Sequence, residues 1–255
     1  MPDRIGIFGG TFDPVHIGHL IAAAELRHAL HLDRVLFVPT GSPPHKGNVT
    51  VAPAADRLAM LQLAIAGEPS FAVSTIELDR TGPSYTVDTI AALRSAHPDA
   101  TLVLLMGEDS LRDLPTWREP DRILALAEVG VATRPGVDVD LTALSISLPA
   151  ARDRVTVVPI PGIGVSSRDI RRRVADGLPI TFLTPRTVGE HIFSNGLYRD
   201  LQGRGVTGTV DESPPRVPSS GEPDDRSSPS DGETTPSNSV ELPARRVRNR
   251  DSTPA

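Results

Sequence analysis

His16 and His19 lie three residues apart, directly after the glycine-rich stretch Gly9-Gly10-Thr11-Phe12. Residues with this spacing share one face of a helix, so both imidazoles point to the same place if a helix has begun there. A glycine turn lets the backbone approach an anion closely, and a helix that follows directs its unpaired N–H groups and positive dipole end at that anion. The pattern predicts a phosphate site, with two imidazoles that donate hydrogen bonds where negative charge develops.

The two histidines also allow two simpler interpretations. The first is a capped helix start that carries surface histidines. The second is a zinc pair, but the chain has no cysteine, and His28 and His31 follow twelve residues later. At about 100° per residue the second pair is rotated by roughly 120° from the first, so the four do not form one cluster on a straight helix. Among the three interpretations, only phosphate binding uses the glycine turn as well.

The elements around this stretch alternate between strand and helix patterns. Short apolar runs predict strands at Ile5–Phe8, Val35–Val38, Phe71–Leu78, Thr101–Met106, Glu128–Thr133 and Arg154–Pro159. Amphipathic stretches predict helices at Gly18–His31, Ala54–Ala66, from Ser84–Asp88 to Ala96, Ser167–Asp176 and Pro185–Phe193. This alternation predicts an α/β fold, namely a Rossmann-like, doubly wound parallel sheet with helices on both faces and a small C-terminal helical part.

Composition restricts the class of protein. The formal net charge of -6 over 255 residues argues against a protein that coats nucleic acid, because such binding depends on clustered Lys and Arg. The absence of cysteine excludes disulfides, thiolate zinc sites and a cysteine nucleophile. No apolar stretch is long enough for a secretory signal or a membrane span, so we expect a cytoplasmic, soluble protein that binds neither nucleic acid nor membrane. The sequence does not determine the oligomeric state.

The last part of the chain differs from the rest. Eight prolines fall between Pro214 and Pro254, among Ser, Asp, Glu, Thr and Gly and almost no large apolar residues. Such a segment cannot bury enough apolar surface to offset its ordering entropy. We therefore predict one domain over residues 1–200 and a disordered tail over residues 201–255, in which the basic run Arg245–Arg250 is a solvated charge run.

The stretch from Gly9 to His19 resembles the signature of the nucleotidylyltransferase superfamily, in the long form found in bacterial nicotinate-nucleotide adenylyltransferases. Later segments resemble the same family in the same order, and the likeness spans Ile5 to Leu197. These segments are Pro43–Lys46, Ser84–Thr89, Gly107–Leu111 with Trp117, Arg134 after a strand, Val165–Arg171, and Phe182–Pro185 with Val188 and Ile192.

The resemblance implies an enzyme that joins nicotinate mononucleotide to the adenylyl group of ATP, with Mg²⁺ carried on the ATP phosphates. It implies that His16 and His19 are catalytic and bind the triphosphate. Near those anions we expect their pKa to rise above about 6.5, with at least one imidazolium in the bound state. The implied ATP-binding residues are Gly9, Gly10, Thr11, Phe12, Gly107, Asp109, Ser166, Ser167 and Arg171. The implied nicotinate-nucleotide-binding residues are Lys46, Tyr85, Thr86, Trp117 and Arg134.

Several alternatives stay open at this point. A related transferase could act on nicotinamide mononucleotide or another phosphorylated acceptor, because the residues alone do not separate acid from amide. A nucleotide-binding regulatory module could keep the fold without the chemistry. Single residues have simpler roles as well: Ser166 or Ser167 as a helix N-cap, Trp117 as a core residue and Lys46 as a loop charge.

Overall fold

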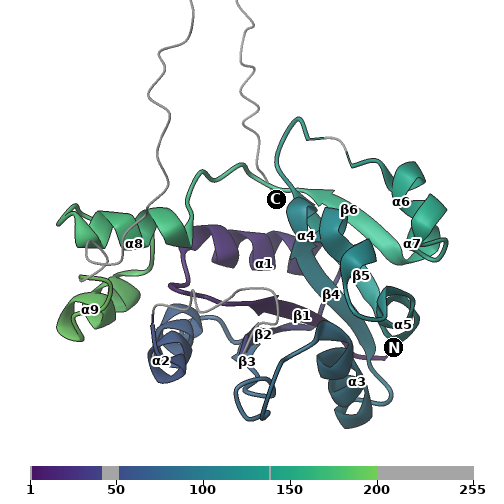
Figure 1. Cartoon of the computed structure of the whole chain (residues 1–255), viewed down its shortest axis with the longest axis horizontal. Coiled ribbons are helices and arrows are strands. Elements are labelled where there is room, and N and C mark those ends of the chain that lie inside the picture. Colours follow the sequence, from purple (N-terminus) through teal and green to yellow (C-terminus); the bar gives the residue numbers. More distant parts are fainter. Residues whose placement is uncertain (1, 42–51, 138, 200–255) are drawn as a thin grey trace, which may run out of the picture. The chain divides into compact units, whose positions relative to one another are not determined.

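The computed structural model describes residues 2–41, 52–137 and 139–199. Within these residues, six strands form one parallel sheet in the order β3-β2-β1-β4-β5-β6 (Figure 1). The strands are β1 (Arg4–Gly10), β2 (Arg34–Pro39), β3 (Phe71–Val73), β4 (Thr101–Gly107), β5 (Glu128–Thr133) and β6 (Val155–Pro159). The order of the strands reverses between β1 and β4, as it does in Rossmann-like sheets. The predicted Rossmann-like fold is confirmed.

The helices cover both faces of this sheet, as predicted. Figure 1 shows α1 over one face and α3 over the other. The helical elements are α1 (Ile17–Ala29), α2 (Ala54–Ile65), α3 (Thr86–Ala96), α4 (Glu108–Asp113), the 3₁₀ turn η1 (Leu114–Thr116), α5 (Pro120–Leu126), α6 (Leu141–Ser147), α7 (Ala151–Arg154), α8 (Ser167–Ala175) and α9 (Arg186–Ser194). The predicted helices do not include the short elements α4, η1, α5, α6 and α7. Among these, α6 begins where the Asp140 side chain accepts a 2.9 Å hydrogen bond from the backbone N–H of Ala143.

Two apolar clusters, one on each face of the sheet, form the core. Along β4, Leu102, Leu104 and Met106 belong to the cluster beneath α3, and Val103 and Leu105 belong to the cluster with α1. Alternate residues of a strand point to opposite faces, so a strand covered on both faces is apolar throughout. This is why Thr101–Met106 is an almost continuous apolar run.

The predicted strand from Phe71 to Leu78 is wrong beyond Val73. β3 lies at the edge of the sheet and pairs with β2 over three residues only. The chain then turns, with the Thr75 hydroxyl donating to the Asp79 carboxylate at 2.7 Å and the backbone N–H of Asp79 donating to the carbonyl of Thr75 at 2.9 Å. Ile76 packs against the core from this turn, so its apolar character reflects burial and not strand pairing.

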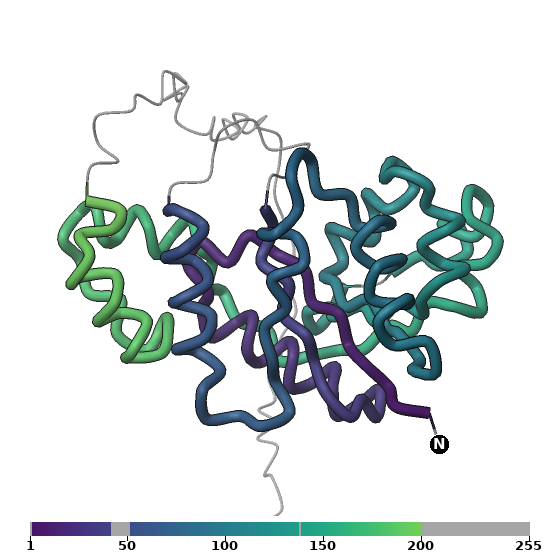
Figure 2. Tube along the Cα trace, turned by 90° about the horizontal axis from the view of Figure 1, so that it is seen from below, coloured from purple at the N-terminus to yellow at the C-terminus, as the bar shows by residue number. Residues whose placement is uncertain are grey.

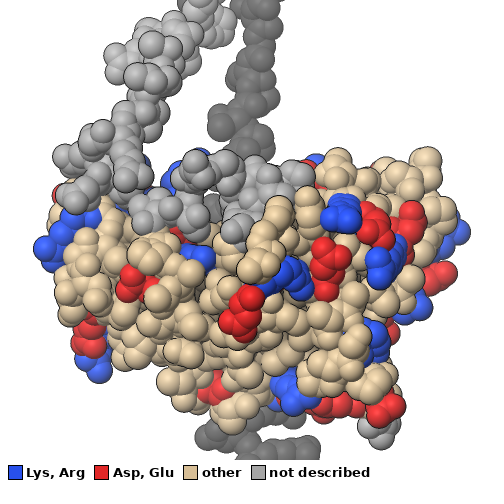
Figure 3. All heavy atoms as spheres, turned by 60° about the horizontal axis from the view of Figure 1, so that its bottom comes forward, with Lys and Arg blue, Asp and Glu red and all other residues tan. Residues whose placement is uncertain are grey.

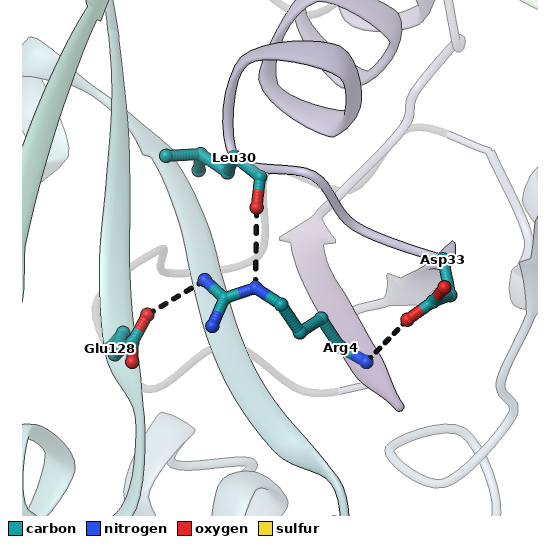
Figure 4. A network of polar contacts seen from close by, with 4 residues as sticks. All are labelled: Arg4, Leu30, Asp33 and Glu128. Carbon is teal, nitrogen blue, oxygen red and sulfur yellow. Dashed lines mark hydrogen bonds and ion pairs between the residues drawn. The ribbon is translucent and has the colours of Figure 1, made fainter. Parts of the chain in front are cut away.

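Arg4 fixes the amino end of the sheet relative to α1 (Figure 4). Its guanidinium donates to the Glu128 carboxylate at 2.9 Å and to the carbonyl of Leu30 at 3.3 Å. Its backbone N–H donates to the carboxylate of Asp33 at 2.7 Å. A partly exposed ion pair of this kind stabilises the fold only slightly. Its geometric effect is to hold the C-terminal end of α1 against β1 and β5, at the end of the helix farthest from the two histidines.

The C-terminal helices pack beside α2. In Figures 1 and 2, α9 lies along α2, and buried residues of α2, α8 and α9 share the cluster that contains α1. On the face shown in Figure 3, basic and acidic side chains are intermixed over the described residues. No helix in the described ranges is long and apolar enough to cross a membrane. The predicted tail, residues 201–255, lies outside them.

Candidate functional site

A cavity of about 570 Å³ opens at the carboxyl ends of β1 and β4. Parallel sheets bind ligands at this place, where the strand order reverses. The predicted site residues that line the cavity are Gly9, Gly10, Thr11, His16, His19, Tyr85, Thr86, Gly107 and Trp117. The sheet and the starts of α1 and α3 therefore bring together residues of the implied ATP-binding group and of the implied nicotinate-nucleotide-binding group. These residues come from positions about a hundred residues apart in the sequence.

His16 and His19 stack on each other at the start of α1. Their ring centroids are 3.7 Å apart with an angle of 24° between the planes. The backbone N–H of His16, the N-cap residue, donates to Nδ1 of His19 at 3.2 Å. An Nδ1 that accepts a hydrogen bond carries no proton, so the neutral His19 has its proton on Nε2. The Nε2–H group of His19 is then available as a hydrogen-bond donor.

Burial favours the neutral form of both histidines. It lowers the pKa of His16 to about 4, and it lowers the pKa of His19 to about 3, with a further contribution from repulsion by His16. In the protein alone, both rings are therefore neutral at pH 7. The rise that we expected from the sequence concerns the site with triphosphate bound, where the anion would have to outweigh this burial. That expectation stays a prediction.

The loop before α1 packs against the histidine pair. Phe12 is buried, adopts a left-handed backbone conformation with φ of 49°, and places its ring edge-on to His19 at 5.1 Å between centroids. A Cβ atom on Gly18 would lie 3.1 Å from the His16 ring, and one on Gly10 would lie 3.0 Å from the Phe12 ring. Glycine at positions 10 and 18 thus permits the close packing that fixes both imidazoles.

A buried polar network holds the other side of this loop. The Tyr198 hydroxyl donates to the Asp13 carboxylate at 2.7 Å, and the Arg171 guanidinium donates to the backbone carbonyl of Asp13 at 2.6 Å. Arg57, which is 2% exposed, donates to the carbonyl of Thr11 at 2.9 Å. Buried groups of this kind are costly unless paired, so their bonds determine the loop conformation. No sequence pattern indicated Arg57 or Tyr198 as part of this network.

The start of α8 stands beside the same loop. Ser166 is the N-cap, and its hydroxyl accepts from the backbone N–H of Asp169 at 3.1 Å. The Ser167 hydroxyl donates to the carbonyl of Pro14 at 2.8 Å. Neither serine is among the residues that line the cavity, although the preceding Val165 is. Ser166, Ser167 and Arg171 therefore contact the loop or cap the helix in this structure.

Three other predicted residues lie differently. The Asp109 side chain is 75% exposed, pairs with Arg112 at 3.0 Å and is not among the residues that line the cavity, although Gly107 is. Arg134 pairs with Glu108 at 3.0 Å and is not among the cavity residues. Lys46 lies outside the described residues.

The cavity also contains polar residues to which the sequence analysis gave no site role, namely Glu77, Ser84, Thr89, Ser110 and Arg118. Thr89 donates to the buried Glu77 carboxylate at 2.8 Å, and burial raises the pKa of Glu77. Ser84 and Thr89 lie in the segment Ser84–Thr89, Ser110 lies in Gly107–Leu111, and Arg118 follows Trp117, whereas Glu77 had no such signal. Over the described ranges, no three His, Asp or Glu side chains gather so that they could hold a metal ion.

Comparisons with known proteins agree with this geometry. A family model described as cytidylyltransferase-like matches residues 7–173. The chain is 56% identical over 199 residues to a probable nicotinate-nucleotide adenylyltransferase of Thermomicrobium roseum, covering 78% of this chain and 93% of the relative. It is 45% identical over 198 residues to the protein of the same name from Thermus thermophilus, covering 77% of this chain and 100% of the relative.

Solved structures show the same fold at much lower identity. Nicotinic acid mononucleotide adenylyltransferase of Plasmodium falciparum, complexed with APC, superimposes with a TM-score of 0.63 at 17% identity, covering 77% of this chain and 97% of that one. The same protein complexed with NaAD gives a TM-score of 0.62 at 19% identity, with the same coverage. At these identities the likeness concerns the fold.

Proposed function

The chain belongs to the nicotinate-nucleotide adenylyltransferases of the cytidylyltransferase-like family, and we propose that it transfers the adenylyl group of ATP to nicotinate mononucleotide. The products are deamido-NAD and pyrophosphate. The observation that carries this proposal is the stacked His16–His19 pair at the start of α1, inside the cavity at the reversal of strand order.

The reaction needs no covalent enzyme intermediate. A phosphate oxygen of nicotinate mononucleotide attacks the α-phosphorus of ATP in line, the bond between the α-phosphorus and the bridging oxygen breaks, and pyrophosphate leaves with that oxygen. The protein has to position the two phosphates and stabilise the charge that moves to the leaving group. In the proposal, the backbone from Gly9 to Thr11 cradles the triphosphate, and Nε2–H of His19 and the His16 ring bind its oxygens.

The second substrate takes the other side of the cavity. Trp117 is partly buried against the core and also lines the cavity, so it can pack and stack at once. We assign it to the pyridine ring, with Tyr85 and Thr86 beside it at the start of α3. Lys46 and Arg134 remain proposed for the mononucleotide, and Arg134 would have to exchange its bond to Glu108 for that role.

The remaining assignments are part of the same proposal. In the proposal, Gly107 and Asp109 bind the nucleotide at the end of β4. Four further residues act on ATP indirectly, because they fix the conformation of the loop before α1: Phe12, Ser166, Ser167 and Arg171. Mg²⁺ arrives on the ATP phosphates as part of the substrate. The division into a domain over residues 1–200 and a tail over residues 201–255, and the cytoplasmic location, stay predictions.

Release of pyrophosphate tests the proposal. The full chain is incubated with ATP, Mg²⁺ and one acceptor at a time: nicotinate mononucleotide, nicotinamide mononucleotide or phosphopantetheine. We expect release with nicotinate mononucleotide, and a product with the mass of deamido-NAD. Preferential release with another acceptor would indicate the related transferase, and ATP binding without release would indicate the regulatory module.

A further inference from the structure

Arg57, near the start of α2, is buried beside the glycine-rich loop. Its side chain is 2% exposed, and its guanidinium donates to the backbone carbonyl of Thr11 at 2.9 Å. Thr11 lines the cavity, whereas Arg57 does not, and Met60 and Leu61 of the same helix belong to the core. The guanidinium therefore contacts the loop from the side of the core, so its effect on a ligand in the cavity would pass through the backbone.

The hydrogen bond from Arg57 fixes a peptide at which the loop is strained. Phe12, the next residue, adopts a left-handed backbone conformation with φ of 49°. This conformation is costly for a large aromatic residue and persists only where the surroundings enforce it. The bond to Thr11 is one such restraint, because it holds the carbonyl of the peptide that joins Thr11 to Phe12.

The same peptide carries a backbone donor on its other side. In a trans peptide the N–H and the carbonyl point in opposite directions, so the N–H of Phe12 is directed away from Arg57. This N–H donates to no backbone carbonyl in the described part of the chain. Successive N–H groups beside a left-handed residue can form a concave site that binds anions. The orientation that Arg57 imposes thus suits a loop whose N–H groups meet phosphate.

The burial of Arg57 is costly for the fold. Burial lowers the pKa of the guanidinium and the Asp13 carboxylate opposes this shift, so the side chain keeps its charge beside an anionic neighbour. Its Nε atom is buried without a hydrogen-bond partner among the residues that the structure describes. Apolar residues of similar volume stabilise a core as well as such a group does. A role of Arg57 in ligand binding accounts for this cost.

We infer that Arg57 is a positioning residue for the triphosphate. Its bond to the Thr11 carbonyl holds the peptide between Thr11 and Phe12 in the orientation in which the backbone N–H groups of the loop meet the phosphate oxygens of ATP. The inference rests on the proposed function, which supplies the triphosphate. Because Arg57 lies outside the cavity, its loss should weaken binding of the triphosphate without changing the contacts of the acceptor nucleotide.

The test compares two neighbouring residues of α2. Asp56 precedes Arg57 and pairs with His191 of α9 at 3.0 Å, and it does not line the cavity. We measure kcat and both KM values in the full chain and in Arg57→Met, Arg57→Lys and Asp56→Asn. Arg57→Met should raise KM for ATP by about tenfold and change KM for nicotinate mononucleotide by less than about twofold. Arg57→Lys should show a smaller rise, and Asp56→Asn should leave both KM values unchanged.

Calorimetric titration with inorganic pyrophosphate and Mg²⁺ gives a readout without turnover. Arg57→Met should bind pyrophosphate about tenfold more weakly than the unmodified chain, and Asp56→Asn should bind it equally well. If Arg57→Met does not fold, Arg57→Lys decides, because lysine keeps the charge but lacks the planar fork of donors. Pyrophosphate affinity in Arg57→Lys equal to that of the unmodified chain would then overturn the inference.

Three further outcomes separate positioning from a purely structural role. A fall in kcat with both KM values unchanged in Arg57→Met would indicate fewer folded molecules, and equal rises in both KM values would indicate general loosening of the site. Either result would overturn the inference. If the unmodified chain binds pyrophosphate but transfers no adenylyl group, the proposed function fails while weaker binding in Arg57→Met still supports the inference. If it binds neither pyrophosphate nor ATP, both fail.

Discussion

The hydroxyl of Tyr198 donates a 2.7 Å hydrogen bond to the carboxylate of Asp13, a residue 185 positions earlier in the chain. Both side chains are buried, at 5% and 3% exposure. Burial, together with the Asp13 carboxylate, raises the pKa of Tyr198, so the phenol keeps its proton and donates. The residues after α9 thus hold the loop that ends at His16.

Replacing this phenol should destabilise the protein. Tyr198→Phe removes one donor from a buried carboxylate and leaves the ring in place, so the free energy of unfolding should fall by about 1–3 kcal/mol, as measured by urea denaturation. Ser147→Ala, which removes an exposed hydrogen bond in α6, should change it by less than about 0.5 kcal/mol. A Tyr198→Phe variant as stable as Ser147→Ala would show that the bond does not hold the loop.

The histidine pair should make stability depend on pH. In the folded protein the pKa of His16 is about 4 and that of His19 about 3, against about 6.5 for an unperturbed histidine. Below pH 6.5 the unfolded chain therefore binds more protons than the folded one, and the stability that is present at pH 7 is lost as the pH falls toward 4. Each histidine contributes at most about 1.4 kcal/mol per pH unit over this window.

Urea denaturation at pH 7 and pH 5 isolates this contribution. The double variant His16→Asn with His19→Asn removes both titrating rings, so it should lose less stability between these pH values than the unmodified chain. His28→Asn changes an exposed histidine on the same helix and should keep the full dependence. If the double variant showed the same dependence as the unmodified chain, burial would not be what keeps these rings neutral.

The proposed role of His19 predicts a large loss of turnover. His19→Ala removes a donor that acts where charge develops, so kcat should fall by roughly a hundredfold or more, with the fold intact by circular dichroism. His28→Ala provides the control on the exposed face of α1 and should keep near-normal turnover. Near-normal turnover in His19→Ala would rule out the assigned role.

Trp117 should affect one substrate more than the other. Trp117→Ala removes the ring proposed to stack on pyridine, so KM for nicotinate mononucleotide should rise by about tenfold, with a smaller change for ATP. Trp117→Phe should retain much of the binding, because it keeps an aromatic face. Equal changes in both KM values would instead indicate a general loss of packing around η1.

Local sequence predicted the parts of this protein that depend on nearby residues. The apolar run of β4 is explained by the burial of this strand on both faces of a parallel sheet. The glycine turn before His16 and His19 indicates that a strand ends there and a helix starts. The predicted extension of β3 to Leu78 failed because an apolar residue such as Ile76 can be buried by a turn as well as by a strand.

Contacts between distant segments were decided only by the tertiary structure. Asp13 looks like a turn residue in the sequence, and only the folded chain brings it to Tyr198 and Arg171. The Arg118 guanidinium lies over the Tyr85 ring at the start of α3 only because the segment after η1 packs there. The physical reason is that strand and helix patterns arise from interactions within a few residues, whereas the partners of a buried charge are set by which elements pack together. The sequence by itself predicted a phosphate site at His16 and His19, and the packing decided which side chains line the cavity around them.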